Sequence, residues 1–272
     1  MKAREAVAWA ARELAEAGVD EPRVDAELLA AHVLGVSRAE LWITDAEVPV
    51  ERLRELVSRR RAREPLAYVL GEWGFRRLTL RVDRRALVPR PETEVVVDRC
   101  LALVRDLERP RVLDVGVGSG AIALALADEH PGAQITGIDS SERALALARE
   151  NAERTGLAVE LVQRDLGDGL PAGPWDLVVS NPPYIPAEEL AGLAPEVRSW
   201  EPTDATLDRG QTAVVIAGAR SVLAAGGWLV LETHWKGAPD VVRALEHGGY
   251  RAPRISRDLA GRERVVEGQW PG

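Results

Sequence analysis

The 272-residue sequence is short of cysteine, histidine and aromatic residues, and it contains no long apolar run. A single cysteine, Cys100, excludes an intrachain disulfide. No pair of cysteines or histidines has the spacing of a zinc site, so we expect no metal. The start of the chain lacks an apolar signal core, and no apolar stretch reaches membrane-spanning length. These absences predict a cytoplasmic protein with no membrane partner.

The charge is unevenly distributed along the chain. The net charge is −8 and the pI is near 5.3, which argues against a protein that holds nucleic acid mainly through phosphates. Residues 1–85 carry a net charge of +1 and the remainder carries −9. The basic run at 59–63 is either a solvated helix face or a contact for RNA or an acidic partner, and the sequence leaves both open.

Helical periodicity dominates the first third of the sequence. Helices are expected at 6–14 and at 24–34, the second stopped by Gly35. Ser37 and Glu40 have the spacing of a capping box, which predicts a short third helix, and Pro49 fits the first turn of a fourth that runs to about residue 63.

Strand and helix patterns alternate in the rest of the chain, after a connector at 64–92 that contains a strand near 78–82. Such alternation predicts an α/β fold with a parallel, doubly wound sheet. We expect a fifth sheet strand at 226–232 and a strand at 264–267 that closes the sheet.

A glycine-rich segment, Gly116-Val117-Gly118-Ser119-Gly120, lies between an apolar strand at 111–115 and a helix-prone run at 121–127. This is the βα turn that binds nucleosides or phosphates in doubly wound sheets, and taken alone it also fits a dinucleotide fingerprint. Asp114 favours S-adenosylmethionine, because a carboxylate there suits the ammonium of a methionine moiety better than a pyrophosphate. The glycine spacing also resembles that of class I methyltransferases.

Acidic residues follow the next two strands. Asp139 ends a strand at 133–138, where an acid binds ribose hydroxyls in either family. Asp165 and Leu166 follow a strand at 159–163, and in methyltransferases an acid at that place sits near the adenine amino group. Each acid alone is more often a helix cap or a solvated residue, but three acids at three successive strand ends favour a nucleoside site.

The segment Asn181-Pro182-Pro183-Tyr184 follows a buried strand pattern at 175–180. Prolines remove backbone donors and leave carbonyl oxygens facing outward, while Asn181 adds a side-chain carbonyl and Tyr184 a flat apolar face. Such a pocket accepts two hydrogen bonds from a planar NH2 group. The pattern predicts chemistry on an amide or exocyclic amino nitrogen; the alternative is a rigid turn.

Together these segments resemble the glutamine N5-methyltransferases of peptide-chain release factors over nearly the whole chain. The resemblance rests on 25–29, 64–71, Val88-Pro89-Arg90-Pro91-Glu92-Thr93-Glu94, the glycine loop, 181–186 and 258–262. It implies a class I S-adenosylmethionine-dependent methyltransferase with a seven-stranded, mostly parallel sheet. It also implies a helical substrate-recognition domain at 1–75, a connector at 76–92 and a catalytic domain at 93–272. The expected partners are release factors, and we expect a monomer.

The resemblance assigns roles to matching residues. Asn181, Pro182 and Tyr184 are expected to be catalytic, and with Pro183 and Arg90 to bind substrate. The expected cofactor set is Asp114, Gly116, Val117, Gly118, Ser119, Gly120, Asp139, Asp165, Leu166 and Asn181. The expected reaction is methylation of the glutamine of a Gly-Gly-Gln motif.

Some residues depart from the family's pattern, at 72–77, 207–211 and 231–234. The main alternative is an N6-adenine methyltransferase acting on flipped DNA or RNA bases, although the acidic balance and the lack of a large insertion count against it. An inactive interaction module and a dehydrogenase are further alternatives. His234 is a candidate base, but the sequence favours its explanation as a surface or strand-end residue.

Overall fold

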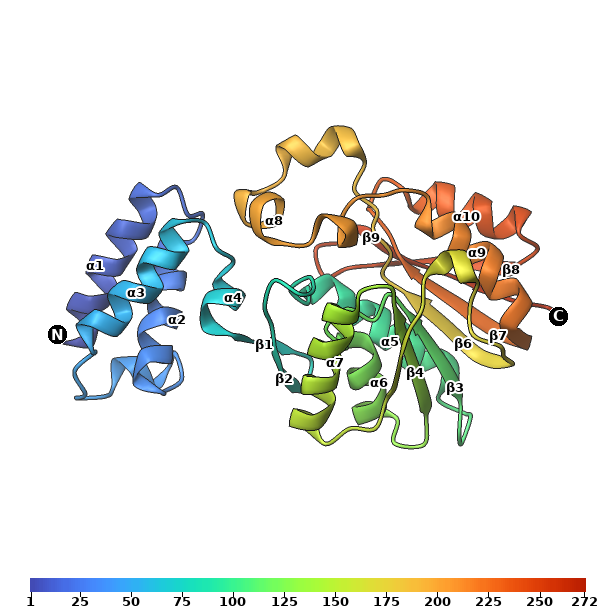
Figure 1. Ribbon diagram of the computed structural model, residues 1–272, viewed down its shortest axis with the longest axis horizontal. Coiled ribbons are helices and arrows are strands. Elements are labelled where there is room, and N and C mark those ends of the chain that lie inside the picture. Colours follow the sequence, from blue (N-terminus) through green and yellow to red (C-terminus); the bar gives the residue numbers. More distant parts are fainter. The chain divides into compact units, whose positions relative to one another are not determined.

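The computed structural model describes all residues, 1–272, and they form two compact units. We call Met1–Glu72 together with Leu193–Trp200 the helical unit, and Trp73–Gly192 together with Glu201–Gly272 the sheet unit (Figure 1). The helical unit is thus discontinuous in sequence, which the expected boundary near residue 75 does not anticipate. No helix in the chain is both long enough and apolar enough to cross a bilayer.

The helical unit buries one apolar core between its helices, with Leu14, Leu29, Leu53 and Leu56 fully buried. Its helices are α1 (Ala3–Glu16), α2 (Pro22–Leu34), η1 (Glu40–Trp42), α3 (Val50–Arg61), α4 (Leu66–Leu70) and α8 (Pro195–Trp200). Helix α2 ends at Gly35, whose φ of 67° is left-handed, as expected from the sequence.

The capping box predicted at Ser37 and Glu40 is confirmed. The Ser37 N–H donates to Glu40 Oε2 (2.8 Å), and the Glu40 N–H donates to Ser37 Oγ (3.2 Å). The turn that follows is a 3₁₀ helix of three residues rather than an α-helix.

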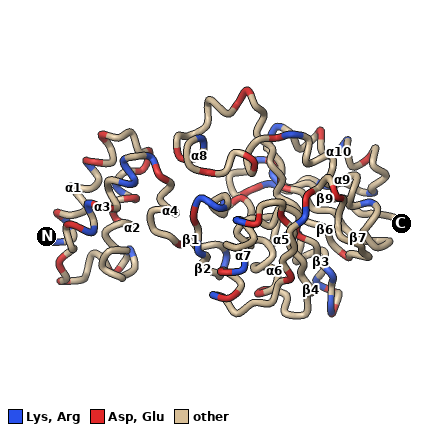
Figure 2. Tube along the Cα trace, viewed as in Figure 1, with Lys and Arg blue, Asp and Glu red and all other residues tan.

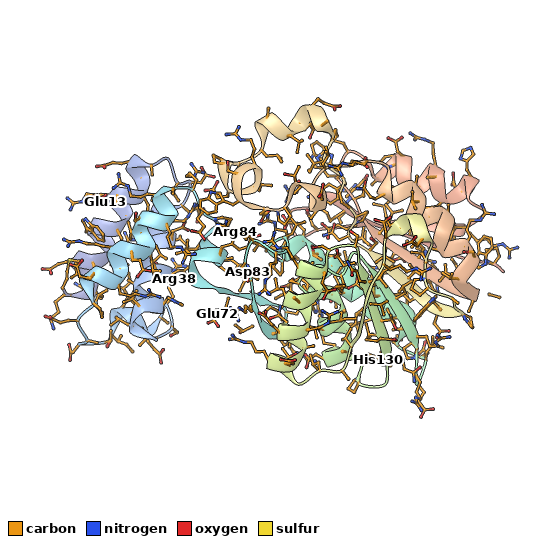
Figure 3. All side chains as sticks on the ribbon, in the orientation of Figure 1. Glu13, Arg38, Glu72, Asp83, Arg84 and His130 are labelled. Atoms are coloured by element: carbon orange, nitrogen blue, oxygen red, sulfur yellow. The ribbon has the colours of Figure 1, made fainter.

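The basic run at 59–63 is engaged in ion pairs within the helical unit. Arg60 is buried and contacts Asp25 and Glu196 at 2.7 Å each, and Glu196 also pairs with Arg63. The remaining pairs of this run are Arg59–Glu64 and Arg61–Glu13. Figure 2 shows acidic and basic segments alternating over α1 to α3, and Figure 3 labels Glu13 in this unit. These arginines therefore all have carboxylate partners within the unit.

The sheet unit contains a seven-stranded sheet with the order β5-β4-β3-β6-β7-β9-β8. Its strands are β3 (Arg111–Val115), β4 (Gln134–Asp139), β5 (Glu160–Gln163), β6 (Trp175–Ser180), β7 (Leu223–Glu232), β8 (Arg251–Arg257) and β9 (Glu263–Gln269). Pairing is parallel from β5 to β7, and β9 runs antiparallel to both of its neighbours. The predicted fold, a doubly wound and mostly parallel seven-stranded sheet, is confirmed.

The strand expected at 264–267 does not close the sheet. β9 lies between β7 and β8, and β8 forms the edge. Its sequence, RAPRISR, contains a proline and three arginines, and most of its residues are exposed. An edge strand with one solvated face gives little apolar signal, so periodicity misses it.

Helices cover both faces of the sheet. The helices α5 (Glu94–Val104), α6 (Ala121–Glu129) and α7 (Glu142–Thr155) contribute to one core, and α9 (Gln211–Val222) and α10 (Ala238–His247) to the other. The hairpin of β1 (Glu72–Phe75) and β2 (Leu78–Arg81) buries Phe75 and Leu80 in the first core, so the segment expected to be a connector is part of the sheet unit's packing.

Strand register brings the motif segments to one edge of the sheet. Val115 of β3 lies opposite Ile138 of β4 and Ser180 of β6, and Ser180 lies opposite Leu231 of β7. Residues 116, 139, 181 and 232 each follow these aligned positions directly. The strand order reverses between β3 and β6, and this switch point is where doubly wound sheets bind ligands.

Candidate active site

The glycine loop is stabilised by its own backbone. The N–H groups of Gly116 and Val117 both donate to the Ile138 carbonyl, at 2.8 and 2.9 Å, and the Gly118 N–H donates to Asp139 Oδ2 at 3.0 Å. Gly116, Gly118 and Gly120 have φ values of 77°, 57° and 87°, which side-chain-bearing residues rarely adopt. The sequence predicts a loop that offers free N–H groups, but the Gly120 N–H also donates, to the Val117 carbonyl (2.9 Å), so four of the loop's N–H groups already have partners. A pyrophosphate therefore finds fewer donors here than a dinucleotide site provides.

Asp114 lies beneath this loop and is 1% exposed. Its Oδ2 accepts a hydrogen bond from the Ala123 N–H in the first turn of α6 (3.1 Å), and its Oδ1 has no donor within the protein. Burial raises the pKa of Asp114 to about 7, against the effect of the Ala123 N–H. A buried carboxylate oxygen without a donor suits a cationic ligand and repels a phosphate.

Asp139 is positioned by two backbone donors. Its Oδ2 accepts from Gly118 and its Oδ1 from the Ser141 N–H (2.9 Å), so the carboxylate joins the end of β4 to the glycine loop. Burial raises the pKa of Asp139, and the two N–H groups oppose that effect. Each oxygen keeps a lone pair that can accept a ribose hydroxyl.

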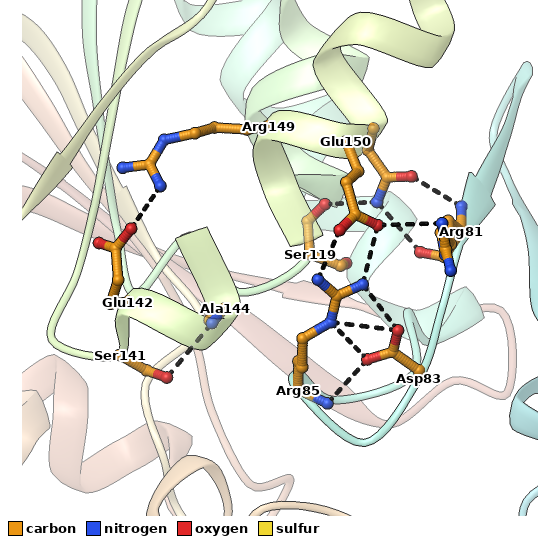
Figure 4. Close-up of polar contacts among 10 residues, drawn as sticks. Arg81, Asp83, Arg85, Ser119, Ser141, Glu142, Ala144, Arg149 and Glu150 are labelled. Carbon is orange, nitrogen blue, oxygen red and sulfur yellow. Dashed lines mark hydrogen bonds and ion pairs between the residues drawn. The ribbon is translucent and has the colours of Figure 1, made fainter. Parts of the chain in front are cut away.

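Asn151 of α7 supports the glycine loop from behind. Its side chain is fully buried, donates to the Ser119 carbonyl (2.9 Å) and the Arg81 carbonyl (3.0 Å), and accepts from the Arg81 N–H (2.7 Å). Figure 4 shows the neighbouring cluster, in which Arg85 contacts both Asp83 and Glu150. The sequence alone does not indicate this role of Asn151, because a single asparagine in a helix pattern carries no functional signal.

Asp165 is exposed, and its carboxylate caps the 3₁₀ helix η3 (Leu166–Asp168) by accepting from the Gly167 N–H at 2.7 Å. Asp165 therefore acts as a helix cap, and its Oδ2 accepts no hydrogen bond from the protein. Leu166 is half-buried and lines an apolar cavity of about 400 Å³ with residues of α9.

Asn181, Pro182, Pro183 and Tyr184 leave the end of β6 in an irregular segment. Ser180 anchors its start, because its hydroxyl donates to the Val115 carbonyl of the adjacent strand (2.7 Å). Asn181 Nδ2 donates to Thr93 Oγ1 (3.4 Å), and the Tyr184 hydroxyl donates to Glu232 Oε1 (3.3 Å). The asparagine and the tyrosine are thus both held by side chains from other elements.

Glu232 and Thr93 bond to each other and to this segment, and sequence reasoning gives neither a role. The Thr93 hydroxyl, at the end of the 3₁₀ helix η2 (Pro91–Thr93), donates to Glu232 Oε2 at 2.6 Å. Glu232 is 1% exposed. Burial raises the pKa of Glu232 to about 7, and the Thr93 hydroxyl and Arg264 oppose that rise.

Arg90 and His234 lie at the margins of the pocket. Arg90 Nη2 contacts both carboxylate oxygens of the buried Glu201 at 2.6 Å, so its charge is already neutralised. His234 is half-buried, with its ring centroid 6.3 Å from that of Tyr184. Burial lowers the pKa of His234.

The chain is similar in sequence to known proteins over its whole length. Residues 5–71 match the model of the PrmC N-terminal domain, and residues 97–194 match the methyltransferase small domain. The release factor glutamine methyltransferase of Deinococcus radiodurans is 42% identical and covers 100% of both chains. That of Geobacter sulfurreducens is 40% identical over 98% of this chain and 96% of its own.

The chain belongs to the release factor glutamine methyltransferase family.

Membership confirms the predicted enzyme class, a methyltransferase of protein glutamine, over the dehydrogenase and N6-adenine alternatives. Two solved structures share the fold at low identity. A Pyrococcus furiosus methyltransferase has a TM-score of 0.51 and 18% identity over 82% of this chain and 98% of its own. A Thermus thermophilus 16S rRNA N2 G1207 methyltransferase in complex with AdoMet and guanosine has a TM-score of 0.53 and 17% identity over 73% of this chain and 49% of its own.

Proposed function

We propose that this enzyme methylates the side-chain amide nitrogen of the glutamine in the Gly-Gly-Gln motif of release factors, with S-adenosylmethionine as the methyl donor. The observation that carries the proposal is the placement of Asn181 and Tyr184 beside the glycine loop, at the switch point of the sheet. Membership of the release factor glutamine methyltransferase family supports it.

The residues beneath and beside the glycine loop fit S-adenosylmethionine. Asp114 Oδ1, buried and without a donor, would accept the ammonium of its methionine part, and Asp139 would accept the ribose hydroxyls. Asp165 and Leu166 would face the adenine, with Gly116 to Gly120 as the floor. When bound, S-adenosylmethionine supplies an electrophilic methyl carbon on a sulfonium.

Asn181 and Pro182 would hold the substrate amide. An amide nitrogen is a poor nucleophile because its lone pair is delocalised into the carbonyl, so the enzyme's main task is alignment. Asn181 Oδ1 and the Pro182 carbonyl would accept the two N–H groups of the glutamine, while Tyr184 and Pro183 pack against its plane. Holding both hydrogens fixes the nitrogen and favours its pyramidalisation. Formation of the N–CH3 bond would break the S–CH3 bond of the donor and leave S-adenosylhomocysteine, a neutral thioether. The N-methylated nitrogen would then be strongly acidic and would lose its extra proton to water without a dedicated base.

Arg90 would act indirectly on substrate. Its ion pair with Glu201 joins the segment before η2 to the segment that follows α8. We therefore assign to it the shaping of the pocket rim rather than a direct bond to the glutamine.

The test is transfer of label from S-adenosylmethionine to a purified release factor, with a factor whose Gly-Gly-Gln glutamine is replaced by alanine as the control. We expect label in the first and none in the second. Equal labelling of both would place the methyl group elsewhere, and labelling of an adenine-containing oligonucleotide instead would favour the base methyltransferase alternative.

A further inference from the structure

The side-chain amide of Asn181 has two possible orientations, and only one of them serves the reaction. With Oδ1 toward the substrate, Asn181 accepts an N–H of the glutamine. With Nδ2 toward the substrate, two NH2 groups face each other, and the pocket instead attracts the glutamine carbonyl. The pocket must therefore contain something that distinguishes the oxygen of Asn181 from its nitrogen.

A chain of hydrogen bonds supplies that distinction. An ionised carboxylate only accepts hydrogen bonds, so Glu232 requires the hydroxyl protons of both Thr93 (2.6 Å) and Tyr184 (3.3 Å) to point toward it. The Thr93 oxygen then has only lone pairs to offer in other directions. Asn181, 3.4 Å away, must turn its Nδ2 donor toward Thr93, which leaves Oδ1 facing away.

We propose that Thr93 and Glu232 are positioning residues that fix the amide of Asn181 with its oxygen toward the substrate glutamine. This inference rests on the proposed function for the identity of the substrate. Neither residue would touch the substrate: Thr93 would act through Asn181, and Glu232 would act through Thr93 and Asn181 and also through the Tyr184 hydroxyl.

The orientation depends on the charge of Glu232. If Glu232 is neutral, its own O–H can donate to the Thr93 oxygen, which frees the Thr93 proton to donate to Asn181 Oδ1 and reverses the amide. The groups that face Glu232 are Thr93 and Glu92 of η2, Tyr184 after β6 and Arg264 of β9. Burial places the pKa of Glu232 at about 7, so the reversal falls in an accessible pH range.

Three variants of these two residues separate positioning from simple support of the fold. Thr93→Val keeps the shape of the side chain but removes the hydroxyl, and Thr93→Ser keeps the hydroxyl but removes the methyl. Glu232→Gln keeps an oxygen that can accept from Thr93 and cannot ionise.

The experiment measures kcat and KM for release factor methylation across pH 5.5–8.5. We expect kcat of the wild type to rise with pH through about 7. Thr93→Val should lower kcat by about tenfold or more with KM nearly unchanged, because one hydrogen bond in a chain to a charged group is lost. Thr93→Ser should restore most of the rate, and Glu232→Gln should abolish the acid limb of the pH profile. Equal losses in Thr93→Val and Thr93→Ser, or an unchanged acid limb in Glu232→Gln, would overturn the proposal.

A second measurement needs no substrate and separates this inference from the proposed function. In the ¹⁵N-labelled enzyme with S-adenosylhomocysteine, the side-chain NH2 signals of Asn181 should shift with pH through about 7 in the wild type. The shift should vanish in both Glu232→Gln and Thr93→Val. A pH-independent Asn181 signal in the wild type would refute the orientation mechanism even if release factors are methylated. Failure to methylate release factors, with the shift present, would refute only the proposed function.

Discussion

The helical unit and the motif edge of the sheet both bury carboxylates, but they surround them differently. In the helical unit, the half-buried Glu196 contacts Arg60 and Arg63, and the buried Glu27 contacts Arg23 and Arg38. At the sheet edge, Asp114 accepts from one backbone N–H, and Glu232 accepts from two hydroxyl groups, with Arg264 near it but in no direct ion pair with it. Charges compensated by arginine hold a structure together, whereas charges left with neutral donors remain available for a ligand or a proton. The difference separates the carboxylates that join helices in the helical unit from the two to which we assign a part in the proposed reaction.

The largest expected effect is the loss of stability caused by Arg60→Met in the helical unit. The change leaves Asp25 without its 2.7 Å partner and Glu196 with Arg63 alone, inside a unit where Arg60 is buried. Breaking a buried ion pair from one side costs about 3–5 kcal/mol, so the free energy of unfolding should fall by that amount in urea denaturation. Arg54→Ala is the matched control, since its pair with Glu51 is exposed and should cost about 1 kcal/mol or less. Equal effects of the two variants would contradict the distinction.

Asn181→Ala removes a proposed hydrogen-bond acceptor for the substrate at the sheet edge. The rate of release factor methylation should fall about 10²–10³-fold, the cost of losing a positioned transition-state contact. Affinity for S-adenosylhomocysteine by calorimetry should change far less, because Asn181 lies at the methyl end of the site. Asn181→Asp, which keeps an oxygen and adds a charge, should bind cofactor normally and still fail in transfer. A wild-type rate in Asn181→Ala would refute the amide pocket.

Asp139→Ala should weaken cofactor binding by about 1.5–3 kcal/mol, because charge-assisted hydrogen bonds to the ribose are lost. The same change releases the Gly118 and Ser141 N–H groups, so the glycine loop loosens as well. Asp165→Ala should have a smaller effect, since Asp165 is exposed and already caps η3. Calorimetry with S-adenosylhomocysteine and with NAD decides; tighter binding of NAD would contradict the proposed cofactor.

The carboxyl groups of Asp114 and Glu196 should respond to pH in opposite directions. The pKa of Asp114 is raised to about 7, so the folded state binds more protons than the unfolded state between about pH 4 and 7, and this contribution to stability is lost as pH rises through about 7. Burial alone would raise the pKa of Glu196, but Arg63 and Arg60 outweigh it and lower the pKa, so its contribution is lost as pH falls below its usual range.

Denaturation at several pH values tests these signs. Asp114→Asn should remove a slope of up to about 1.4 kcal/mol per pH unit between about pH 4 and 7. Glu196→Gln should be more destabilising at pH 7 than at pH 4. The same sign of slope in both variants would show that the two environments do not differ as described.

Local chemistry explains which parts of this site the sequence predicts. The glycine loop, Asp139 and Asn181 directly follow buried strands, and parallel strands bring their ends to one edge, so these positions can be predicted without coordinates. Thr93 and Glu232 are 139 residues apart, and no spacing rule connects the end of a 3₁₀ helix with the end of β7. The contacts of Asn151 with Arg81 and Ser119 cannot be predicted for the same reason, because they join residues far apart in the sequence.

The fold shows the same division. Helix caps and the order of strands and helices follow from local patterns, as at Ser37 and Gly35. The edge strand β8 is polar and exposed. Residues 193–200 belong to the helical unit, where Glu196 pairs with Arg60 and Arg63, and no periodicity predicts such a long-range contact.

The discontinuous helical unit has a consequence for synthesis on the ribosome. Arg63 emerges 133 residues before its partner Glu196. At roughly 5–20 residues per second, Arg63 is synthesised about 7–27 s before that carboxylate. Until then Arg60 has only Asp25 as a carboxylate partner. The first helices to be made should therefore reach their final stability only after most of the sheet strands have left the ribosome.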